Sequence, residues 1–378
     1  MSAGGEVIPS GAIYAEKKKK KSITKLLRCV WLKRDLHGAG DSLASIRVPD
    51  AIPIPSVDCE RLKKAFQGLR TDTKTIISIL GHRDAAQRAD IREAYQLLCN
   101  ESLISRLHLE LSGDLRVQNS PFFNLGIVSN PRFLQKAMKL WAYDPPERDA
   151  RLAFEALKAK KKPIKHLQVI VEIACTSSPH HLVAVRKAYC TLYDCSIEED
   201  IISHVAMPLR KILLALVTAY RYDKYLVETD LAKSDALKIH EAIESNSLTN
   251  DEFMYILSTR SFHHLREAFH RYEKTFGTTL YAKVTDLGKG ELETLLGVVF
   301  RCIVSPEKHF AEVINRSVIG LGTDEDSLTR VIVSRAEVDM VRIKRAYVTM
   351  YQTSLEGAVG GDTSGYYKKF LMTLLGAI

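Results

Sequence analysis

The apolar positions of this 378-residue chain recur with the period of an α-helix. In segment after segment they fall at i, i+3 and i+4, for example at Leu213, Leu216 and Val217. Alternating apolar and polar positions, which would predict strands, are scarce, and proline lies between the periodic segments. The pattern therefore predicts an all-α protein.

One sequence frame recurs four times along the chain. The segment Ile76–Arg83 resembles Leu328–Arg335 at an offset of 252 residues, and the helical patterns that follow them resemble each other at the same offset. Four residues mark the equivalent position in the four copies: Arg83, Ser177, Arg260 and Arg335. Their spacings are 94, 83 and 75 residues. Repeats of this period predict stacked helical units that share a core.

The frame divides the chain into five parts. The predicted parts are a basic tail expected to be disordered (1–58), repeat 1 with an insert at 117–135 (59–144), repeat 2 (145–220), a linker and repeat 3 (221–304), and repeat 4 (305–378). Each repeat spans about 75 residues once the inserts are removed. The length and the 46% apolar content are sufficient for one large core or two paired cores.

Charge and cysteine content restrict the partners and the compartment. The formal net charge of +9 favours anionic partners without separating lipid from nucleic acid. No aromatic-rich RNA-binding motif is present, so we predict no specific nucleic acid. No apolar run reaches eighteen residues, and the N-terminus lacks a signal-peptide pattern. Seven cysteines without CxxC spacing favour a reducing cytosol over a disulfide framework or a zinc site.

The segment 320–324, Gly-Leu-Gly-Thr-Asp, is the strongest candidate for a binding loop. Its two glycines permit a backbone path that turns carbonyl oxygens inward. Asp362 follows Thr323 by 39 residues and can close such a loop with a carboxylate. Ca²⁺ takes six to eight oxygen ligands in flexible geometry, so this combination predicts a calcium site. Thr323 and the acidic residues after it are also typical of a helix start.

Four repeats of about 75 residues, one with GxGT and a carboxylate 39 residues further on, resemble the annexin family. The amino-acid sequences of the repeats are similar to those of plant annexins, for example over 77–88, 171–176 and 329–339. The resemblance covers residues 46–116 and 136–378. It implies five helices per repeat, a slightly curved disc, and Ca²⁺-dependent docking of the convex face onto anionic phospholipid such as phosphatidylserine.

The resemblance assigns roles to single residues of repeat 4. It implies that Val318, Gly320 and Gly322 supply carbonyl ligands and that Asp362 supplies the carboxylate. Leu321, at the loop tip, is expected among the lipid headgroups. A single carboxylate implies weak intrinsic affinity, so lipid phosphate would complete the coordination shell.

Repeat 1 keeps part of the same pattern. Its carbonyl ligands would come from Phe66, Gly68 and Arg70, its carboxylate from Glu110, and its loop tip would be Leu69. Arg70 replaces the second glycine. A left-handed backbone at a non-glycine residue costs about 1 kcal/mol, so we expect a weakened site rather than a lost one.

Repeats 2 and 3 have lost the pattern. His204 stands at the acid position of repeat 2, and Leu287 stands at that of repeat 3. The repeat 2 loop instead carries a basic run, and four of its residues are predicted to contact lipid phosphate: Lys160, Lys161, Lys162 and Lys165. The alternative is a solvated charged loop.

Two further segments depart from the frame. Removing the insert 117–135 restores the 75-residue spacing, and the insert is rich in helix breakers. It is either a genuine loop or a retained in-frame intron, and it is expected to bulge from the surface or to break the last helix of repeat 1. The tail carries Lys17–Lys21 before interleaved apolar and basic residues. The tail has a functional interpretation, as an amphipathic segment that lies on the membrane or as a nuclear-import patch. The alternative is a solvated tail without a function.

These observations leave three functional hypotheses. The first is Ca²⁺-dependent binding to anionic membranes at their cytosolic face, with no enzyme activity. The second is a Ca²⁺-independent membrane scaffold held by basic residues. The third is a haem peroxidase-like activity, proposed for some plant annexins, at the position of His82; a loop-end cap is the alternative for this residue. Cys175 and Cys302 are interpreted as buried, inert thiols.

Overall fold

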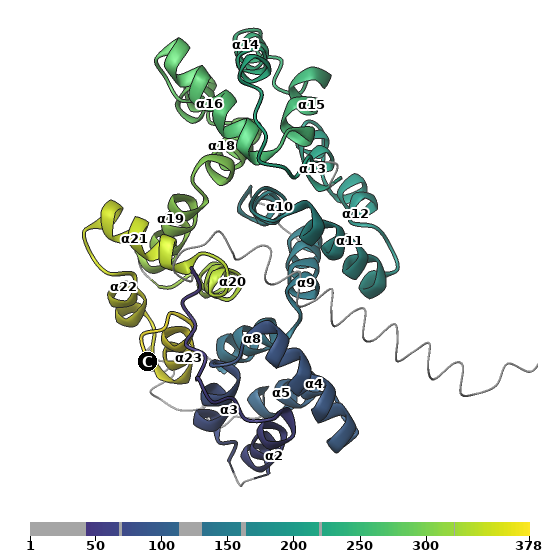
Figure 1. Cartoon of the computed structure of the whole chain (residues 1–378), viewed down its shortest axis with the longest axis vertical. Coiled ribbons are helices and arrows are strands. Elements are labelled where there is room, and N and C mark those ends of the chain that lie inside the picture. The colour runs from purple at the N-terminus through teal and green to yellow at the C-terminus, as the bar shows by residue number, and fades with distance from the viewer. Residues whose placement is uncertain (1–42, 68–69, 113–130, 160–163, 219–220, 321) are drawn as a thin grey trace, which may run out of the picture.

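The computed structural model describes residues 43–67, 70–112, 131–159, 164–218, 221–320 and 322–378. These residues form 20 α-helices and no strand, which confirms the predicted all-α class (Figure 1). The helices fall into four groups of five that lie around the centre of a flattened disc (Figure 1).

The first two groups cover the N-terminal half of the chain. The helices of repeat 1 are α2 (Pro55–Phe66), α3 (Thr73–Leu80), α4 (Ala85–Cys99), α5 (Leu103–Ser112) and α8 (Pro131–Ala142). Those of repeat 2 are α9 (Pro145–Lys158), α10 (Ile164–Thr176), α11 (Pro179–Tyr193), α12 (Ile197–His204) and α13 (Leu209–Val217).

The other two groups follow in the same order. Those of repeat 3 are α14 (Thr229–Glu244), α15 (Asp251–Thr259), α16 (Phe262–Phe276), α17 (Leu280–Leu287) and α18 (Glu291–Val304). Those of repeat 4 are α19 (Pro306–Val318), α20 (Glu325–Arg335), α21 (Met340–Tyr351), α22 (Leu355–Asp362) and α23 (Gly365–Leu374).

The third helix of each repeat shows that the four copies share one register. Equivalent positions in these helices carry a tyrosine that is at most 1% exposed: Tyr95, Tyr189, Tyr272 and Tyr347. The residue after each of these helices has a positive φ: Asn100, Asp194, Gly277 and Gln352. A left-handed residue is a common way to end a helix. Both sets have the spacings of 94, 83 and 75 that the sequence frame predicts.

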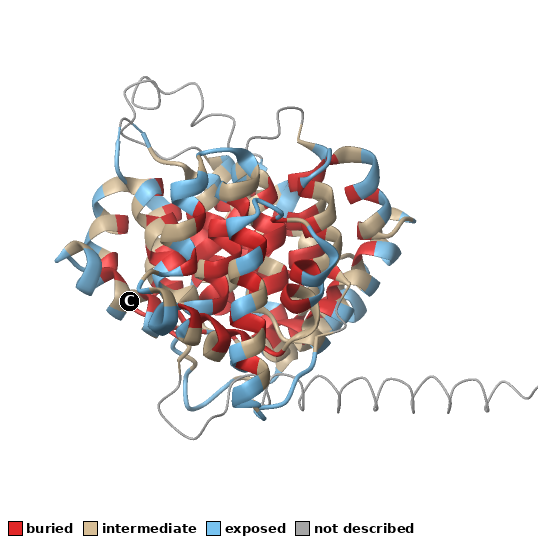
Figure 2. Cartoon of the chain, turned by 90° about the horizontal axis from the view of Figure 1, so that it is seen from above, coloured by how far each residue is buried: buried red, intermediate tan, exposed pale blue. Residues whose placement is uncertain are grey.

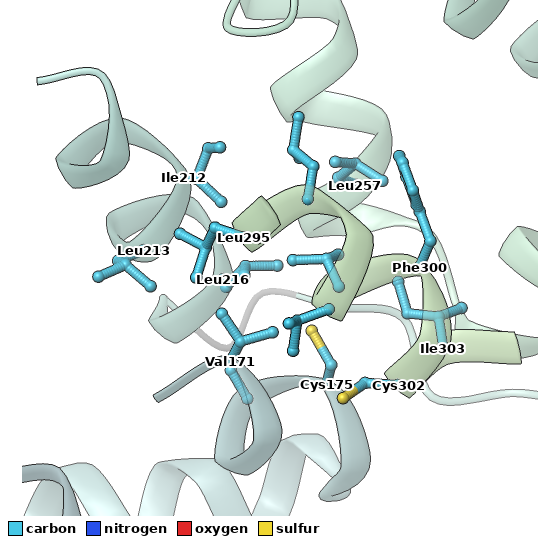
Figure 3. Close-up of a cluster of buried hydrophobic side chains, with 14 of the residues drawn as sticks. Val171, Cys175, Ile212, Leu213, Leu216, Leu257, Leu295, Phe300, Cys302 and Ile303 are labelled. Carbon is cyan, nitrogen blue, oxygen red and sulfur yellow. The ribbon is translucent and has the colours of Figure 1, made fainter. Parts of the chain in front are cut away.

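The buried apolar residues form two clusters, and two repeats supply most of each cluster. One cluster combines repeats 2 and 3, and the other consists mainly of repeats 1 and 4, with a few residues of repeat 2 such as Leu152. Figure 2 shows the buried residues in the middle of the disc. Figure 3 shows part of the repeat 2–3 core, where Cys175 of α10 lies beside Cys302 of α18. Burial raises the pKa of Cys175 to about 12, so this thiol stays protonated and unreactive.

Buried polar contacts connect the two pairs of repeats. Glu172 of α10 forms an ion pair with Arg330 of α20, and it lies 2.9 Å from Nε2 of His309 in α19. All three residues are at most 8% exposed. Because breaking a buried ion pair leaves an uncompensated charge, these contacts favour one fixed arrangement of repeat 2 against repeat 4.

The structure corrects the predicted end of the insert. Residues 131–135 form the first turn of α8, where Leu134 is 7% exposed, and the helix continues unbroken to Ala142. Gln135 Nε2 donates a hydrogen bond to the carbonyl of His108 in α5 (2.7 Å). The helix is therefore intact over residues 131–142, and the expected bulge or break before residue 131 stays a prediction. Residues 113–130 lie outside the described part of the chain.

The structure also corrects the predicted extent of the tail. Ser45 donates from its backbone N–H to the carbonyl of Ala336 (2.8 Å) and from its hydroxyl to that of Leu374 (2.5 Å). Helix α2 already begins at Pro55. The expected disorder is therefore wrong for residues 43–58, because the start of this segment is bound to repeat 4. Residues 1–42, with the lysine run, lie outside the described part.

Candidate functional site

The loop between α19 and α20 contains the two glycines of the candidate site. Gly320 has φ 127° and Gly322 has φ 98°. A Cβ atom at either position would meet no atom within 4 Å. The need for glycine here is therefore conformational rather than steric, because residues with a side chain rarely adopt such φ values. Leu321 between them lies outside the described residues, and Val318 is the last residue of α19.

Hydrogen bonds hold this loop against the end of α22. Thr323 Oγ1 donates to Oδ2 of Asp362 (2.5 Å), the last residue of that helix. The backbone N–H of Asp324 donates to the carbonyl of Ser317 (2.9 Å). Asp324 also caps α20 by accepting from the backbone N–H of Ser327 (3.1 Å). The structure thus brings the distant carboxylate to the glycine loop.

Several acidic residues surround this loop, and two of them pair with lysines of other repeats: Asp324 with Lys165 (3.7 Å) and Asp326 with Lys136 (2.9 Å). Burial first, and then the neighbouring Asp326, Asp324 and Asp362, raise the pKa of Glu325. Neighbouring negative charge of this kind also favours binding of a cation. Among the described residues, no basic side chain forms a salt bridge with Asp362. Nor do the described residues hold a cluster of three or more His, Cys, Asp or Glu side chains suited to a metal. A calcium loop built mainly from carbonyls needs only one carboxylate.

Repeat 1 reproduces the same hydrogen-bonded frame. Thr71 Oγ1 donates to Oε2 of Glu110 (2.6 Å), and the backbone N–H of Asp72 donates to the carbonyl of Ala65 (2.8 Å). Asp72 caps α3 by accepting from the backbone N–H of Thr75 (3.1 Å). Among the predicted ligands, Phe66 ends α2 and Arg70 is exposed, whereas Gly68 and Leu69 lie outside the described residues. The backbone strain expected at Arg70 stays a prediction.

Arg106 is the residue of repeat 1 that the sequence reasoning missed. Its Nη2 lies 2.8 Å from Oε1 of Glu110, one helical turn further along α5. The i, i+4 spacing of an arginine and a glutamate was the available signal. At the offset of 252 residues, the equivalent of Arg106 in repeat 4 is Ala358.

The two degenerate repeats also hold a cation near the fourth helix. In repeat 2, Lys158 Nζ lies 2.8 Å from Oδ1 of Asp200 and 3.4 Å from Nε2 of His204, the residue at the acid position. In repeat 3, Lys283 Nζ lies 2.7 Å from Oε1 of Glu244. In each case a lysine links the end of the first helix to the fourth helix.

The predicted basic cluster of repeat 2 is described only at Lys165. Its side chain is 60% exposed, and its Nζ lies 3.7 Å from Oδ2 of Asp324 in the repeat 4 loop. Lys160, Lys161 and Lys162 lie outside the described residues. The position of Lys165 shows that the start of α10 is a neighbour of the repeat 4 loop.

His82 lies in the turn after α3, where the sequence allowed a haem ligand or a loop-end residue. Its Nδ1 forms a hydrogen bond with the carbonyl of Ser78 (3.0 Å), four residues earlier. This contact caps the last turn of the helix, which is the geometry of the loop-end alternative.

Comparison with known proteins identifies the family. The annexin family model matches residues 57–117, 148–216, 234–299 and 309–374. Annexin D3 of Arabidopsis thaliana is 46% identical over 338 residues, which cover 89% of this chain and 99% of that protein. Annexin-like protein RJ4 of Fragaria ananassa is 42% identical over 319 residues, covering 84% and 95%. The solved structure of annexin III matches with a TM-score of 0.77 at 30% identity, covering 88% and 97%.

This chain belongs to the annexin family. Annexins bind phospholipid membranes in a calcium-dependent manner, and calcium binding is a property of the family. The described helices include none that is long and apolar enough to span a bilayer, and peripheral attachment to membranes fits the family.

Proposed function

We propose that this protein binds anionic phospholipid membranes through Ca²⁺ held in the repeat 4 loop. The carbonyls of Val318, Gly320 and Gly322 and the carboxylate of Asp362 would hold the cation. The observation that supports this most strongly is the Thr323–Asp362 hydrogen bond, which brings the carboxylate to a loop with two glycines at positive φ. The acidic surroundings of Glu325 favour a cation at the same place.

The ligand set explains why membrane and calcium would bind together. Three carbonyls and one carboxylate supply fewer oxygens than the six to eight that Ca²⁺ takes, so lipid phosphate oxygens can complete the shell. Each ligand then raises the affinity of the other, which is thermodynamic linkage. Leu321 would enter the headgroup layer beside the cation. Repeat 1, with Phe66, Gly68, Arg70 and Glu110 as ligands and Leu69 at its tip, would contribute a weaker site.

A second mode of attachment is supported by the position of Lys165. Because this residue lies 3.7 Å from Asp324, the basic repeat 2 loop would meet the same membrane as the repeat 4 loop. Lysines near an anionic surface contribute about 1 kcal/mol each. Lys160, Lys161, Lys162 and Lys165 would therefore give a residual affinity without calcium. In both modes the protein would attach as a peripheral protein, at the cytosolic face of membranes.

Sedimentation with phosphatidylserine vesicles across a Ca²⁺ titration tests the first mode. Asp362→Asn removes the anionic ligand and keeps the shape, so most of the Ca²⁺-dependent binding should be lost. Asp286→Asn is the matched control, because it changes an acid near the end of the fourth helix of repeat 3, where no glycine loop exists. If Asp362→Asn binds as the parent does, the calcium site is elsewhere.

The second mode is tested in chelator at low salt. Changing the four lysines to Gln should lower binding to anionic vesicles, and added NaCl should lower binding of the parent, since the Debye length is about 8 Å at physiological salt. Neutral vesicles should bind neither. The matched control changes Lys17–Lys21 to Gln, because that run could attach to the same vesicles. If the parent and the four-lysine variant bind equally, the lysines do not contact the membrane and form a solvated charged loop.

A further inference from the structure

We infer that Arg106 weakens calcium binding at the repeat 1 loop, because its guanidinium pairs with the carboxylate that the cation needs. This inference rests on the proposed calcium role of the equivalent loop in repeat 4. It assigns repeat 1 the threonine, acid and N-cap contacts seen beside the repeat 4 loop and names a residue that opposes a cation there. Arg106 is then a second obstacle to calcium binding in repeat 1, beside Arg70, which replaces the second glycine of the loop.

The scaffold of repeat 1 matches that of repeat 4 bond for bond. The threonine-to-acid hydrogen bond is 2.6 Å in repeat 1 and 2.5 Å in repeat 4. The bond that closes the loop onto the first helix is 2.8 Å and 2.9 Å, and the N-cap bond is 3.1 Å in both. Loss of the loop frame therefore does not distinguish the two repeats. What differs is the set of charges beside the acid.

The arginine is placed to compete directly with a cation. Arg106 lies 2.8 Å from Glu110 on the same helix, and its guanidinium carbon lies 5.9 Å from the ring centre of Phe66. Phe66 is itself a predicted carbonyl ligand, so the guanidinium contacts the acid and lies near the side chain of the residue that ends the first helix. Its charge satisfies the carboxylate and repels a divalent ion a few ångströms away. The side chains of Arg106 and Glu110 are 30% and 19% exposed, which limits screening by water.

The other repeats support the same interpretation. Repeats 2 and 3, which lack the calcium pattern, hold Lys158 and Lys283 in ion pairs between the first and fourth helices. Repeat 4 has Ala358 at the position of Arg106. Repeat 3 has Lys283 at the position of Arg106, whereas repeat 2 has Asp200 there and takes its cation, Lys158, from the first helix. Repeat 4, which keeps the calcium pattern, has a neutral side chain at that position.

The test uses the full chain with Asp362→Asn, so that repeat 4 does not contribute. Arg70→Gly, Arg106→Gln and the double variant are compared by sedimentation with phosphatidylserine vesicles and by the rise in melting temperature that Ca²⁺ causes without lipid. Arg70→Gly alone should change either readout little. The double variant should need at least about tenfold less Ca²⁺ than Arg70→Gly, because a competing unit charge has been removed. Adding Glu110→Gln should cancel the gain.

Two controls keep the result interpretable. Arg271→Gln removes a partly exposed arginine from an i, i+4 ion pair in repeat 3 and should change neither readout. If the glutamine variant proves less stable, Arg106→Met supplies an uncharged apolar side chain beside Phe66 and should give the same gain. A double variant that needs as much Ca²⁺ as Arg70→Gly overturns the role of Arg106.

The outcome also separates this inference from the proposed function. If the parent chain fails to bind vesicles in Ca²⁺, the proposed function is wrong, while the Ca²⁺-induced rise in melting temperature of the double variant still tests Arg106. If the parent binds and Asp362→Asn does not, but the double variant restores neither readout, only the role of Arg106 is wrong.

Discussion

The loops of repeats 1 and 4 share one hydrogen-bonded frame and differ in charge. Six positions around the repeat 4 loop carry a formal charge of −4: Gly322, Asp324, Glu325, Asp326, Ala358 and Asp362. The equivalent six in repeat 1 carry +1: Arg70, Asp72, Thr73, Lys74, Arg106 and Glu110. The frame depends on a threonine, an acid and an N-cap aspartate, which both repeats keep. The comparison teaches that the frame and the preference for a cation are specified by different residues.

The largest effect on the Ca²⁺ needed for vesicle binding is expected when repeat 4 is given an arginine at the position that Arg106 occupies in repeat 1. Ala358→Arg places a guanidinium one turn before Asp362, as Arg106 precedes Glu110. Repulsion of a divalent ion by a unit charge at about 5 Å is on the order of 2 kcal/mol, which corresponds to about thirtyfold in the Ca²⁺ needed. Vesicle sedimentation across a Ca²⁺ titration measures this shift.

The control for this variant separates charge from size. Ala358→Gln introduces a long polar side chain without charge and should shift the titration by less than about threefold, the scale of a surface substitution. If the glutamine variant needs as much Ca²⁺ as the arginine variant, crowding rather than charge explains repeat 1.

A smaller effect is expected from breaking the threonine contact. Thr323→Val keeps the shape and removes the 2.5 Å hydrogen bond to Asp362, so the carboxylate is less well positioned. Loss of one charge-assisted hydrogen bond costs about 1.5 kcal/mol, or about tenfold in the Ca²⁺ needed. Thr71→Val makes the same change in repeat 1 and should leave Ca²⁺-dependent binding unchanged. An equal loss in both variants would mean that repeat 1 also binds calcium in the parent.

The smallest effect is expected at Glu325. Its pKa is raised, by burial first and then by Asp326, Asp324 and Asp362, so it takes up a proton at a higher pH than an ordinary glutamate. As the pH falls from about 7 to about 5, one negative charge beside the loop is lost early, and the Ca²⁺ needed should rise. Glu325→Gln should raise the requirement about twofold at neutral pH and make the pH dependence shallower. Glu291→Gln, in the first turn of α18, should behave as the parent. If the Ca²⁺ requirement of Glu325→Gln depends on pH as that of the parent does, the charge of Glu325 does not contribute to calcium binding.

The fold, and the approach of Asp362 to the glycine loop, could be predicted from the sequence because the repeat register carries information across long separations. Once Arg83 and Arg335 are aligned, the offset that aligns the helices also aligns Glu110 with Asp362. Arg106 was missed because an arginine four residues before a glutamate is common on any helix. The insert and tail boundaries were wrong because tertiary contacts decide them. Leu134 becomes buried and Ser45 bonds to repeat 4, and neither contact is visible in local sequence.

The pairing of repeat 1 with repeat 4 has a consequence for how the chain is made. Repeat 1 leaves the ribosome first, but apolar residues such as Ile76 and Trp141 are buried in a core that also needs Phe310 and Leu371. At about 5–20 residues per second, the 252-residue offset takes on the order of 10 to 50 s to synthesise. During that interval repeat 1 exposes an apolar face, whereas repeats 2 and 3 follow each other directly and can pack at once. We therefore expect chaperones to be needed most by the N-terminal part of the nascent chain, and chains that end before repeat 4 to aggregate.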